Sequence, residues 1–218
     1  MWCIANITPE YRKRMYDLLN LYEKPYNSKY PVVCIDEKSK QLIGENRTPI
    51  PMKPGSPGKY DYEYKRNGTR NIFVAVEPKA WKRKIQVTRR RTKKDFAKFV
   101  QELIKDYSGA TKIHIVLDNL NTHFESSFYE TFDKKEAKRI LKRIVFHYTP
   151  KHASWLDMAE IEINVLSNQC IAGRISTEEQ LIKQIITWEQ ERNKEEKKII
   201  WKFTKQDADK KLSKHYIP

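Results

Sequence analysis

Two aspartates come directly after apolar runs of this sequence. Asp36 ends the run VVCID, and Asp118 ends the run IHIVLD. A carboxylate is costly to bury unless a positive charge meets it, so each acid either closes a strand or faces a cation. Two adjacent carboxylates would repel each other unless a divalent cation bound between them. Oxygen ligands of this kind suit Mg²⁺ or Mn²⁺. The pair therefore predicts a metal site if its two strands are neighbours.

A third acid is expected from the segment YTPKHASWLDMAEIEINVL, which predicts a helix beginning near Ser154. Asp157 would lie in the first turn, where a negative charge suits the helix dipole. Glu160 lies on the apolar stripe that we expect to face the sheet. Glu162 is about 200° further around the helix, so it would point to solvent or to a basic partner. Taken alone, each acid has a structural explanation, such as a turn cap or a solvated helix face. Together they favour metal-dependent phosphoryl transfer.

These acids need a sheet that brings distant strands together. Apolar runs predict five strands, over Val32–Asp36, Asn71–Pro78, Lys84–Thr88, Lys112–Asp118 and Arg143–Thr149. Capping residues and helical spacing predict helices after Thr8 and Thr92, over Phe128–Ile140, from Ser154, and after Thr177 and Thr204. Three strands followed by a helix and a fourth strand indicate a meander and then a crossover in the same sheet. If the fourth strand returns beside the first, Asp36 and Asp118 become neighbours.

The formal net charge of +15, from 43 lysines and arginines against 28 acids, is the strongest global signal. It favours a polyanion partner, most often nucleic acid, although an unspecialised basic protein would have the same composition. No apolar run approaches the roughly 20 residues of a membrane helix, and the first residues do not resemble a secretory leader. Cys3, Cys34 and Cys170 show neither zinc spacing nor a disulfide framework, so we expect a reducing, cytoplasmic setting.

Residues 44–70 differ in character from the rest of the chain. They contain four of the six glycines and four of the ten prolines. An exposed, solubilising loop is one explanation, but loops of this length are uncommon without a function. We therefore predict that the segment contacts DNA or a partner subunit. Its cations are Arg47, Lys53, Lys59, Lys65, Arg66 and Arg70.

Several motifs together resemble the DDE transposases of bacterial insertion sequences in the mariner superfamily, specifically the IS six-thirty family. The motifs are MWCI, VVCIDEK, QLIGE, YEYKRNGTRNIF, VLDNLNTH, YTPKHASWLDMAEIEI and WKFT, and they extend over nearly the whole chain. The resemblance implies an α/β fold with an RNase H-like mixed five-stranded sheet flanked by helices, over residues 32–218. Residues 1–31 would form a helical lead-in and connector, and residues 44–70 a basic insertion loop.

The resemblance also implies that Asp36, Asp118 and Glu160 are the catalytic, metal-binding triad for Mg²⁺, with Mn²⁺ as a substitute. Two metals about 4 Å apart would activate a water or a 3′-hydroxyl and stabilise the leaving oxygen. Asp36 would bridge both ions, Asp118 would hold one and Glu160 the other. Asp157 stands where many relatives carry asparagine, which leaves its role open.

The implied substrate is double-stranded DNA, cut at the ends of the element and joined to target DNA. His123 and Asn119 could position a phosphate or water, or His123 could be a turn residue. Trp155 is better explained as a core residue than as a platform for base stacking. The predicted DNA contacts are Arg47, Lys53, Lys59, Lys65, Arg66, Arg70, His123 and Lys151.

Full-length relatives carry helix-turn-helix domains ahead of the core, so we expect this chain to be the catalytic half. It would act as a homodimer on DNA, with a separately encoded helix-turn-helix subunit as a candidate partner and no membrane contact. The expected location is the bacterial cytoplasm, on the nucleoid. Two alternatives to an active transposase core are an inactive DNA-binding remnant and an RNase H-like nuclease for RNA or Holliday junctions. The nuclease alternative fits the acids but not the motifs.

Overall fold

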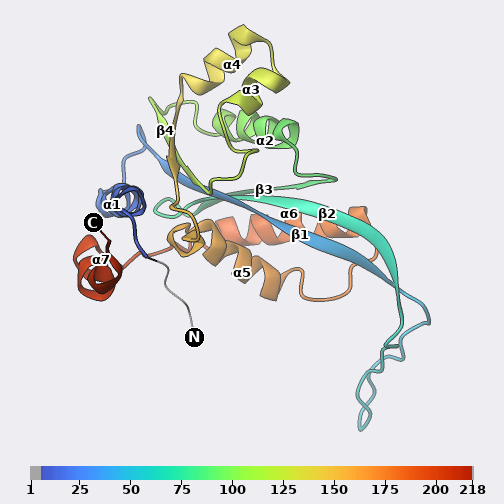
Figure 1. Ribbon diagram of the computed structural model, residues 1–218. Helices are drawn as coiled ribbons and strands as arrows, with labels where there is room; N and C mark the ends of the chain where they lie inside the picture. The colour runs from blue at the N-terminus through green and yellow to red at the C-terminus, as the bar shows by residue number, and fades with distance from the viewer. Residues whose placement is uncertain (1–5, 218) are drawn as a thin grey trace.

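Five strands form one mixed sheet in the computed structural model, which describes residues 6–217; the MWCI motif lies outside these residues. β1, β2 and β3 are an antiparallel meander, β4 pairs with β1 in parallel, and β5 pairs with β4 in parallel. The predicted sheet and the return of the fourth strand to the first are therefore confirmed. The strands are β1 (Val32–Glu45), β2 (Tyr64–Glu77), β3 (Lys82–Thr88), β4 (Ile113–Leu117) and β5 (Ile144–Tyr148), in the order β3-β2-β1-β4-β5 (Figure 1).

β1 and β2 are longer than the sequence predicts. The sequence predicts an end of β1 at Asp36 and a start of β2 at Asn71, but β1 continues to Glu45 and β2 begins at Tyr64. Cross-strand pairing satisfies the backbone polar groups of these extensions without requiring an apolar sequence. The segment predicted as a loop over residues 44–70 is therefore partly a two-stranded ribbon, and only residues 46–63 connect its strands. Figure 1 shows the ribbon projecting away from the rest of the domain.

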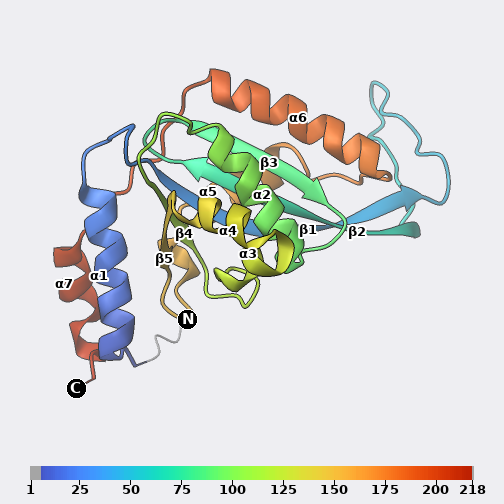
Figure 2. The same cartoon turned by 90° about the horizontal axis from the view of Figure 1, so that it is seen from above.

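Alternate residues of β1 face opposite sides of the sheet. Val33 and Ile35 pack in one core with α2 (Lys93–Lys105), and α3 (Ser126–Thr131) and α4 (Lys134–Leu141) cover the same side. Cys34 packs on the other side, in a core that includes α1 (Pro9–Glu23) and α7 (Lys205–Leu212). Farther along that side, α5 (Ala159–Gln169) covers β1 and β2, and α6 (Glu178–Lys194) packs along β3 (Figures 1 and 2). Consecutive residues of β1 therefore point into different layers.

Four predicted helix starts are confirmed by side-chain caps. The hydroxyls of Thr8, Thr92, Thr177 and Thr204 each accept a hydrogen bond from a backbone N–H in the first turn. Such caps satisfy donors that have no partner inside the helix. None of the helices within residues 6–217 is long and apolar enough to cross a membrane.

Two helix predictions are wrong in detail. The single helix predicted over Phe128–Ile140 is divided into α3 and α4, because the Asp133 carboxylate accepts hydrogen bonds from two backbone N–H groups and starts a new helix. Ser154 does not cap a long helix; it begins only a 3₁₀ turn, Ser154–Leu156. Asp157 then has extended backbone angles, and its side chain accepts a hydrogen bond from the Ala159 N–H. This local hydrogen bond competes with helix continuation, so α5 begins later than predicted.

Candidate active site

Asp36 and Asp118 lie at the same end of two paired strands. Cys34 of β1 is opposite Val116 of β4 in the parallel register, and each aspartate comes two residues later. Side chains two residues apart on a strand share a face, and Cys34 and Val116 both pack in the core beneath α1. The prediction that the fourth strand brings Asp118 beside Asp36 is therefore confirmed.

The segment that leads into α5 adds two acids to this group. Asp157 is only 2% exposed, whereas Glu160, in the first turn of α5, is exposed. The charge of Asp36 acts on Asp157, and the charge of Glu160 acts on Asp36. We call Asp36, Asp118, Asp157 and Glu160 the acid cluster.

Each aspartate of the acid cluster is held through one oxygen by the backbone that follows it. Asp36 Oδ1 accepts a hydrogen bond from the Glu37 N–H at 2.7 Å. Asp118 Oδ1 accepts one from the Leu120 N–H at 3.2 Å, and Asp157 Oδ1 one from the Ala159 N–H at 2.8 Å. The second oxygen of Asp157 is buried and has no hydrogen-bond partner within residues 6–217. The aspartates are thus oriented while their second oxygens stay available to a ligand.

Burial and crowding make ionisation of the acid cluster difficult. Burial is the main reason why the pKa of Asp36 rises to about 7, and the negative charges of Glu160, Glu37 and Asp118 add to it. The Glu37 N–H opposes this shift. Burial likewise raises the pKa of Asp157 well above its ordinary value, with Asp36 and Glu160 contributing. A cation among these groups would reverse both effects.

The donor set fits a divalent cation. Carboxylate oxygens are the ligands that Mg²⁺ and Mn²⁺ prefer, and the orphaned Asp157 oxygen and the raised pKa of Asp36 both indicate uncompensated negative charge. Within the described part of the chain, no three side chains of the types His, Cys, Asp and Glu are gathered tightly enough to form a coordination shell. The side chains would therefore have to move closer together around an ion.

His123 lies behind Asp118, on the α2 side of the sheet. Its Nδ1 is 2.6 Å from Asp118 Oδ1, and its Nε2 is 3.3 Å from Glu37 Oε2. Burial lowers the pKa of His123, but the carboxylates of Asp118 and Glu37 outweigh burial and raise the pKa to about 9. The ring is therefore a buried imidazolium between two carboxylates.

Glu162 is fully buried, so the expectation that it points to solvent is wrong. Arg83 donates to its two oxygens at 2.9 and 3.2 Å, and Arg192 donates to it at 2.9 Å. The alternative expectation, that Glu162 meets a basic partner, is confirmed. Its two partners, Arg83 and Arg192, belong to the same chain. These ion pairs attach α5 to β3 and α6.

The sequence profile described as DDE superfamily endonuclease matches residues 31–182, a range that includes all four members of the acid cluster. The chain belongs to the DDE superfamily endonucleases. Among solved structures, a Mos1 mariner paired-end complex with Mg has a TM-score of 0.58 at 12% identity, over 100% of this chain and 66% of that chain. A Mos1 transposase paired-end complex with the left transposon end has a TM-score of 0.55 at 12% identity, over 86% of this chain and 57% of that chain.

These similarities show that the DDE endonuclease domain shares its fold with Mos1 transposase, and the mixed sheet flanked by helices is the RNase H-like arrangement predicted above. The chain spans less than two thirds of the length of either Mos1 chain. No curated protein is significantly similar to it in sequence.

Most predicted DNA contacts of the DDE endonuclease domain lie on the ribbon rather than beside the acid cluster (Figure 1). Arg70 is partly buried and pairs with Glu178 at 2.8 Å. The exposed cations on the ribbon and its connecting loop are Arg47, Lys53, Lys59, Lys65 and Arg66.

Two other predicted contacts are placed near the acid cluster. Lys151 is exposed and follows β5 closely, and the Thr149 N–H donates to the Leu117 carbonyl at 3.0 Å, next to Asp118. His123 is only 1% exposed. Its two ring nitrogens face carboxylates rather than solvent.

The sequence interpretation of the DDE endonuclease domain overlooked a basic strip between β3 and α2. Arg89, Arg90 and Arg91 are exposed, and Lys93 and Lys94 follow them. A guanidinium nitrogen of Arg91 lies 3.8 Å from the Glu37 carboxylate, so the strip adjoins the side chains that hold Asp118. The run RRRTKK is the sequence signal that could have indicated this strip.

Trp155 lies at the surface, in the segment that leads into α5. Trp155 is 40% exposed, and its ring meets the Phe203 ring edge-on with centroids 5.4 Å apart, so the prediction that it belongs to the core is wrong.

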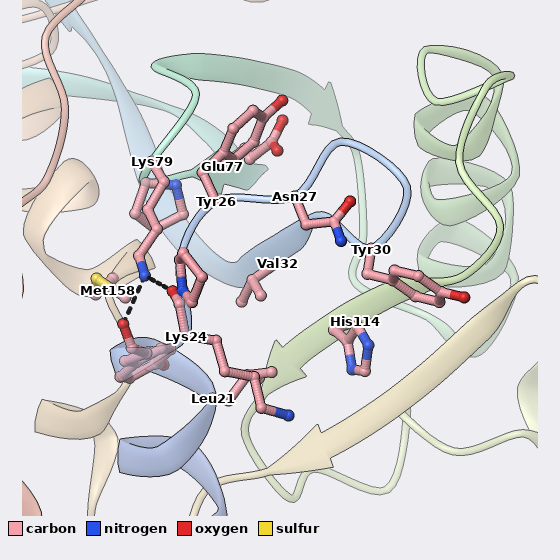
Figure 3. Close-up of a pocket in the computed structure, with 13 residues that line it drawn as sticks. Leu21, Lys24, Tyr26, Asn27, Tyr30, Val32, Glu77, Lys79, His114 and Met158 are labelled. Carbon is pink, nitrogen blue, oxygen red and sulfur yellow. Dashed lines mark hydrogen bonds between the residues drawn. The ribbon is translucent and has the colours of Figure 1, made fainter.

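A largely apolar cavity of about 440 Å³ lies where β1 and β4 begin, lined in part by Val32 and His114 (Figure 3). The acids lie at the opposite ends of these paired segments, so the cavity is not part of the candidate active site.

Proposed function

We propose that this chain is the catalytic core of a DNA transposase, which cuts phosphodiester bonds at the ends of an element and joins them to target DNA. The observation that carries the proposal is the acid cluster within a DDE endonuclease domain. Its aspartates are oriented by backbone N–H groups, and Asp157 keeps a buried oxygen without a partner among residues 6–217. Without positive charge nearby, these carboxyl groups are favoured in their protonated form, so their ionised form needs a cation.

We propose that Mg²⁺ supplies this positive charge, with Mn²⁺ as a substitute. Asp36, Asp118 and Glu160 would hold the ion. Divalent ions in such a site supply Lewis acidity for in-line displacement at phosphorus. Asp157, more deeply buried than the other three, would add its unpartnered oxygen to the site once a cation lowers its raised pKa. The Mos1 complexes with Mg and with Mn support the choice of ions.

We propose that the DNA backbone passes over the basic strip and Lys151. Arg91 of the strip lies 3.8 Å from Glu37, the residue after Asp36, and Lys151 follows Thr149, which is bonded to Leu117 next to Asp118. Phosphate contacts of this kind position DNA without reading its sequence. The overall charge of +15 would add long-range attraction. The exposed Trp155, near the acids in sequence, could stack on an unpaired base.

The ribbon is better suited to a partner subunit than to solubility alone. Its connecting loop exposes apolar and aromatic side chains next to its cations, and exposed apolar groups of this kind commonly mark interaction sites. We therefore propose that the ribbon contacts a second copy of the chain on DNA, in the bacterial nucleoid. A separate helix-turn-helix subunit would supply recognition of the element ends. The exposed apolar residues are Ile50, Met52, Tyr60 and Tyr62 in the loop and Tyr64 at the start of β2.

A nicking assay tests the proposal. The substrate is an end-labelled duplex carrying the DNA that flanks the gene, incubated with the chain and Mg²⁺ or Mn²⁺. We expect strand cleavage that needs the cation and disappears in Asp118→Asn. Binding of the duplex without cleavage, under every metal condition, would instead favour the second candidate, an inactive DNA-binding remnant. Cleavage of RNA–DNA hybrids but not of duplex DNA would contradict both.

A further inference from the structure

His123 connects Asp118 to a second buried carboxylate on the opposite face of the sheet. Its Nδ1 lies 2.6 Å from Asp118 Oδ1, and its Nε2 lies 3.3 Å from Glu37 Oε2. His123 and Glu37 are almost completely buried, whereas Asp118 is partly exposed. The Nδ1 contact is a hydrogen bond, whereas the Nε2 contact is at ion-pair distance without hydrogen-bond geometry. The ring is therefore fixed at both ends.

The two faces of β1 explain how this arrangement arises. Glu37 follows Val33 and Ile35 in alternation, so it points to the α2 side, while its neighbour Asp36 points to the acid cluster. His123 packs against Phe96 of α2, with ring centroids 4.6 Å apart. The ring thus approaches Asp118 from behind the sheet, away from the face that carries Asp36.

The two carboxylate oxygens of Asp118 differ in their hydrogen bonds. The His123 ring and the Leu120 N–H both meet Oδ1, and within the described residues no hydrogen bond ends on Oδ2. The carboxylate is thus held in one rotation by two donors. Oδ2 is the oxygen left for a ligand on the side of the acid cluster.

If His123 had a purely structural role, that role would be to fix the loop after β4. That loop is already held by other bonds: the Tyr148 hydroxyl donates to the His123 carbonyl at 3.0 Å, and the Ser127 hydroxyl to the Thr122 carbonyl at 2.7 Å. Fixing the loop does not account for Glu37. Its carboxylate oxygens are buried without a hydrogen bond among residues 6–217, and a buried carboxylate is costly. Glu37 lies between the His123 ring, at 3.3 Å, and the more exposed Arg91 guanidinium, at 3.8 Å, so the ring is the nearer of its two ion-pair contacts.

We propose that His123 is a positioning residue, held by Glu37, that orients Asp118 so that Oδ2 faces the cation of the active site. The inference rests on the proposed function. Partners of this kind behind a metal ligand typically change metal affinity about 10–100-fold when they are removed. A histidine that touched DNA directly would need an exposed ring nitrogen, whereas both nitrogens of His123 face carboxylates.

Two substitutions of similar polarity separate the two ends of the ring. The amide nitrogen of His123→Asn can replace Nδ1 and donate to Asp118, whereas that of His123→Gln can replace Nε2 and donate to Glu37. We would measure the dissociation constant of Mn²⁺ for the full chain by calorimetry, and the melting temperature without metal. We expect His123→Gln to weaken Mn²⁺ binding about 10–100-fold and His123→Asn to restore it to within about threefold of wild type.

Equal Mn²⁺ affinity in wild type and His123→Gln would overturn this inference alone, because the wild type would still bind the ion. Equal weakening in both variants, in step with their melting temperatures, would also overturn it in favour of a structural role. Absence of Mn²⁺ binding by the wild type would overturn the proposed function as well.

Nuclear magnetic resonance of the His123 ring tests the inference without a substitution at the ring. We expect the Nδ1 proton signal of the metal-free wild type to shift when Mg²⁺ is added. The shift should be absent in Asp36→Asn, which loses the cation without touching the ring. A His123 signal unaffected by Mg²⁺ in a chain that binds the ion would overturn the proposal.

Discussion

Arg83 donates hydrogen bonds to both carboxylate oxygens of Glu162, at 2.9 and 3.2 Å, and neither side chain is exposed to solvent. The two residues are 79 positions apart in the sequence, one on β3 and the other on α5. The ion pair fixes Glu162 on the buried face of α5. Glu160 therefore lies on a different face of the helix, where it belongs to the acid cluster. The ion pair therefore determines which glutamate of this helix is available for chemistry.

Exchange of these two glutamates for glutamine should have different consequences. We expect Glu160→Gln to abolish Mg²⁺-dependent cleavage while leaving the melting temperature and DNA affinity nearly unchanged. Glu162→Gln leaves the buried Arg83 guanidinium without its carboxylate partner, which should cost about 3–5 kcal/mol of folding free energy. Below its lowered melting temperature this variant should retain most of its activity. An active Glu160→Gln beside an inactive but folded Glu162→Gln would show that the roles are reversed.

Divalent cations should stabilise the folded chain through the acid cluster. Mn²⁺ or Ca²⁺ at about a hundred times its dissociation constant should add about 2.7 kcal/mol to the free energy of unfolding. Asp36→Asn and Asp118→Asn should lose most of this gain, measured as the shift in melting temperature. Glu191→Gln, an exposed substitution on α6, is the matched control and should keep it. Identical shifts in all three variants would exclude a shared site at Asp36 and Asp118.

The stability of the metal-free chain should fall as the pH rises from about 4 to about 7. The pKa of Asp36 is raised from 3.8 to about 7 in the folded state, so the folded chain binds the proton more tightly than the unfolded chain does. That contribution is complete below the unfolded pKa and is lost as the pH passes through the folded one. Asp36→Asn should reduce the slope, as measured by denaturant unfolding at several pH values. An unchanged slope would contradict the assignment to Asp36.

Mn²⁺ should reverse this pH dependence, because the ion binds the ionised carboxylates. Its stabilising effect on the wild type should grow between about pH 5 and about pH 8, and the effect should be much smaller in Asp36→Asn.

The ribbon cations should contribute to DNA affinity through phosphate contacts if the ribbon lies on DNA. Replacement of Lys53, Lys59, Lys65 and Arg66 by alanine should then reduce the salt dependence of binding, with a decrease of about one in the logarithmic slope for each phosphate that is no longer neutralised. The slope is measured from dissociation constants over a range of salt concentrations. An unchanged slope, together with a loss of dimers on DNA, would assign the ribbon to the partner subunit alone.

The basic strip should affect cleavage as well as binding. Replacement of Arg89, Arg90 and Arg91 by alanine should reduce the salt slope by up to about three and lower the rate of Mg²⁺-dependent nicking. The control is a triple replacement of exposed lysines at the other end of the sheet, where β1 and β4 begin and α2 ends: Lys24, Lys29 and Lys105. Equal decreases in the two triple variants would indicate a general charge effect rather than a local one.

The sequence alone determined the features that depend on local signals. Apolar runs located the five strands, and threonine caps located the starts of four helices, because burial and first-turn hydrogen bonding act over a few residues. The order of these elements made Asp118 and Asp36 neighbours only if the fourth strand returned beside the first, and the pairing of β4 with β1 meets that condition.

Only the tertiary structure decided the features that depend on partners distant in the chain. The extensions of β1 and β2 are held by pairing with each other, and pairing between backbone groups leaves no apolar pattern to recognise. The burial of Glu162 required Arg83 and Arg192, and the burial of His123 required Glu37 from the far side of the sheet. A charged side chain usually lies in solvent, and it becomes buried only where the fold supplies an opposite charge to offset the loss of hydration.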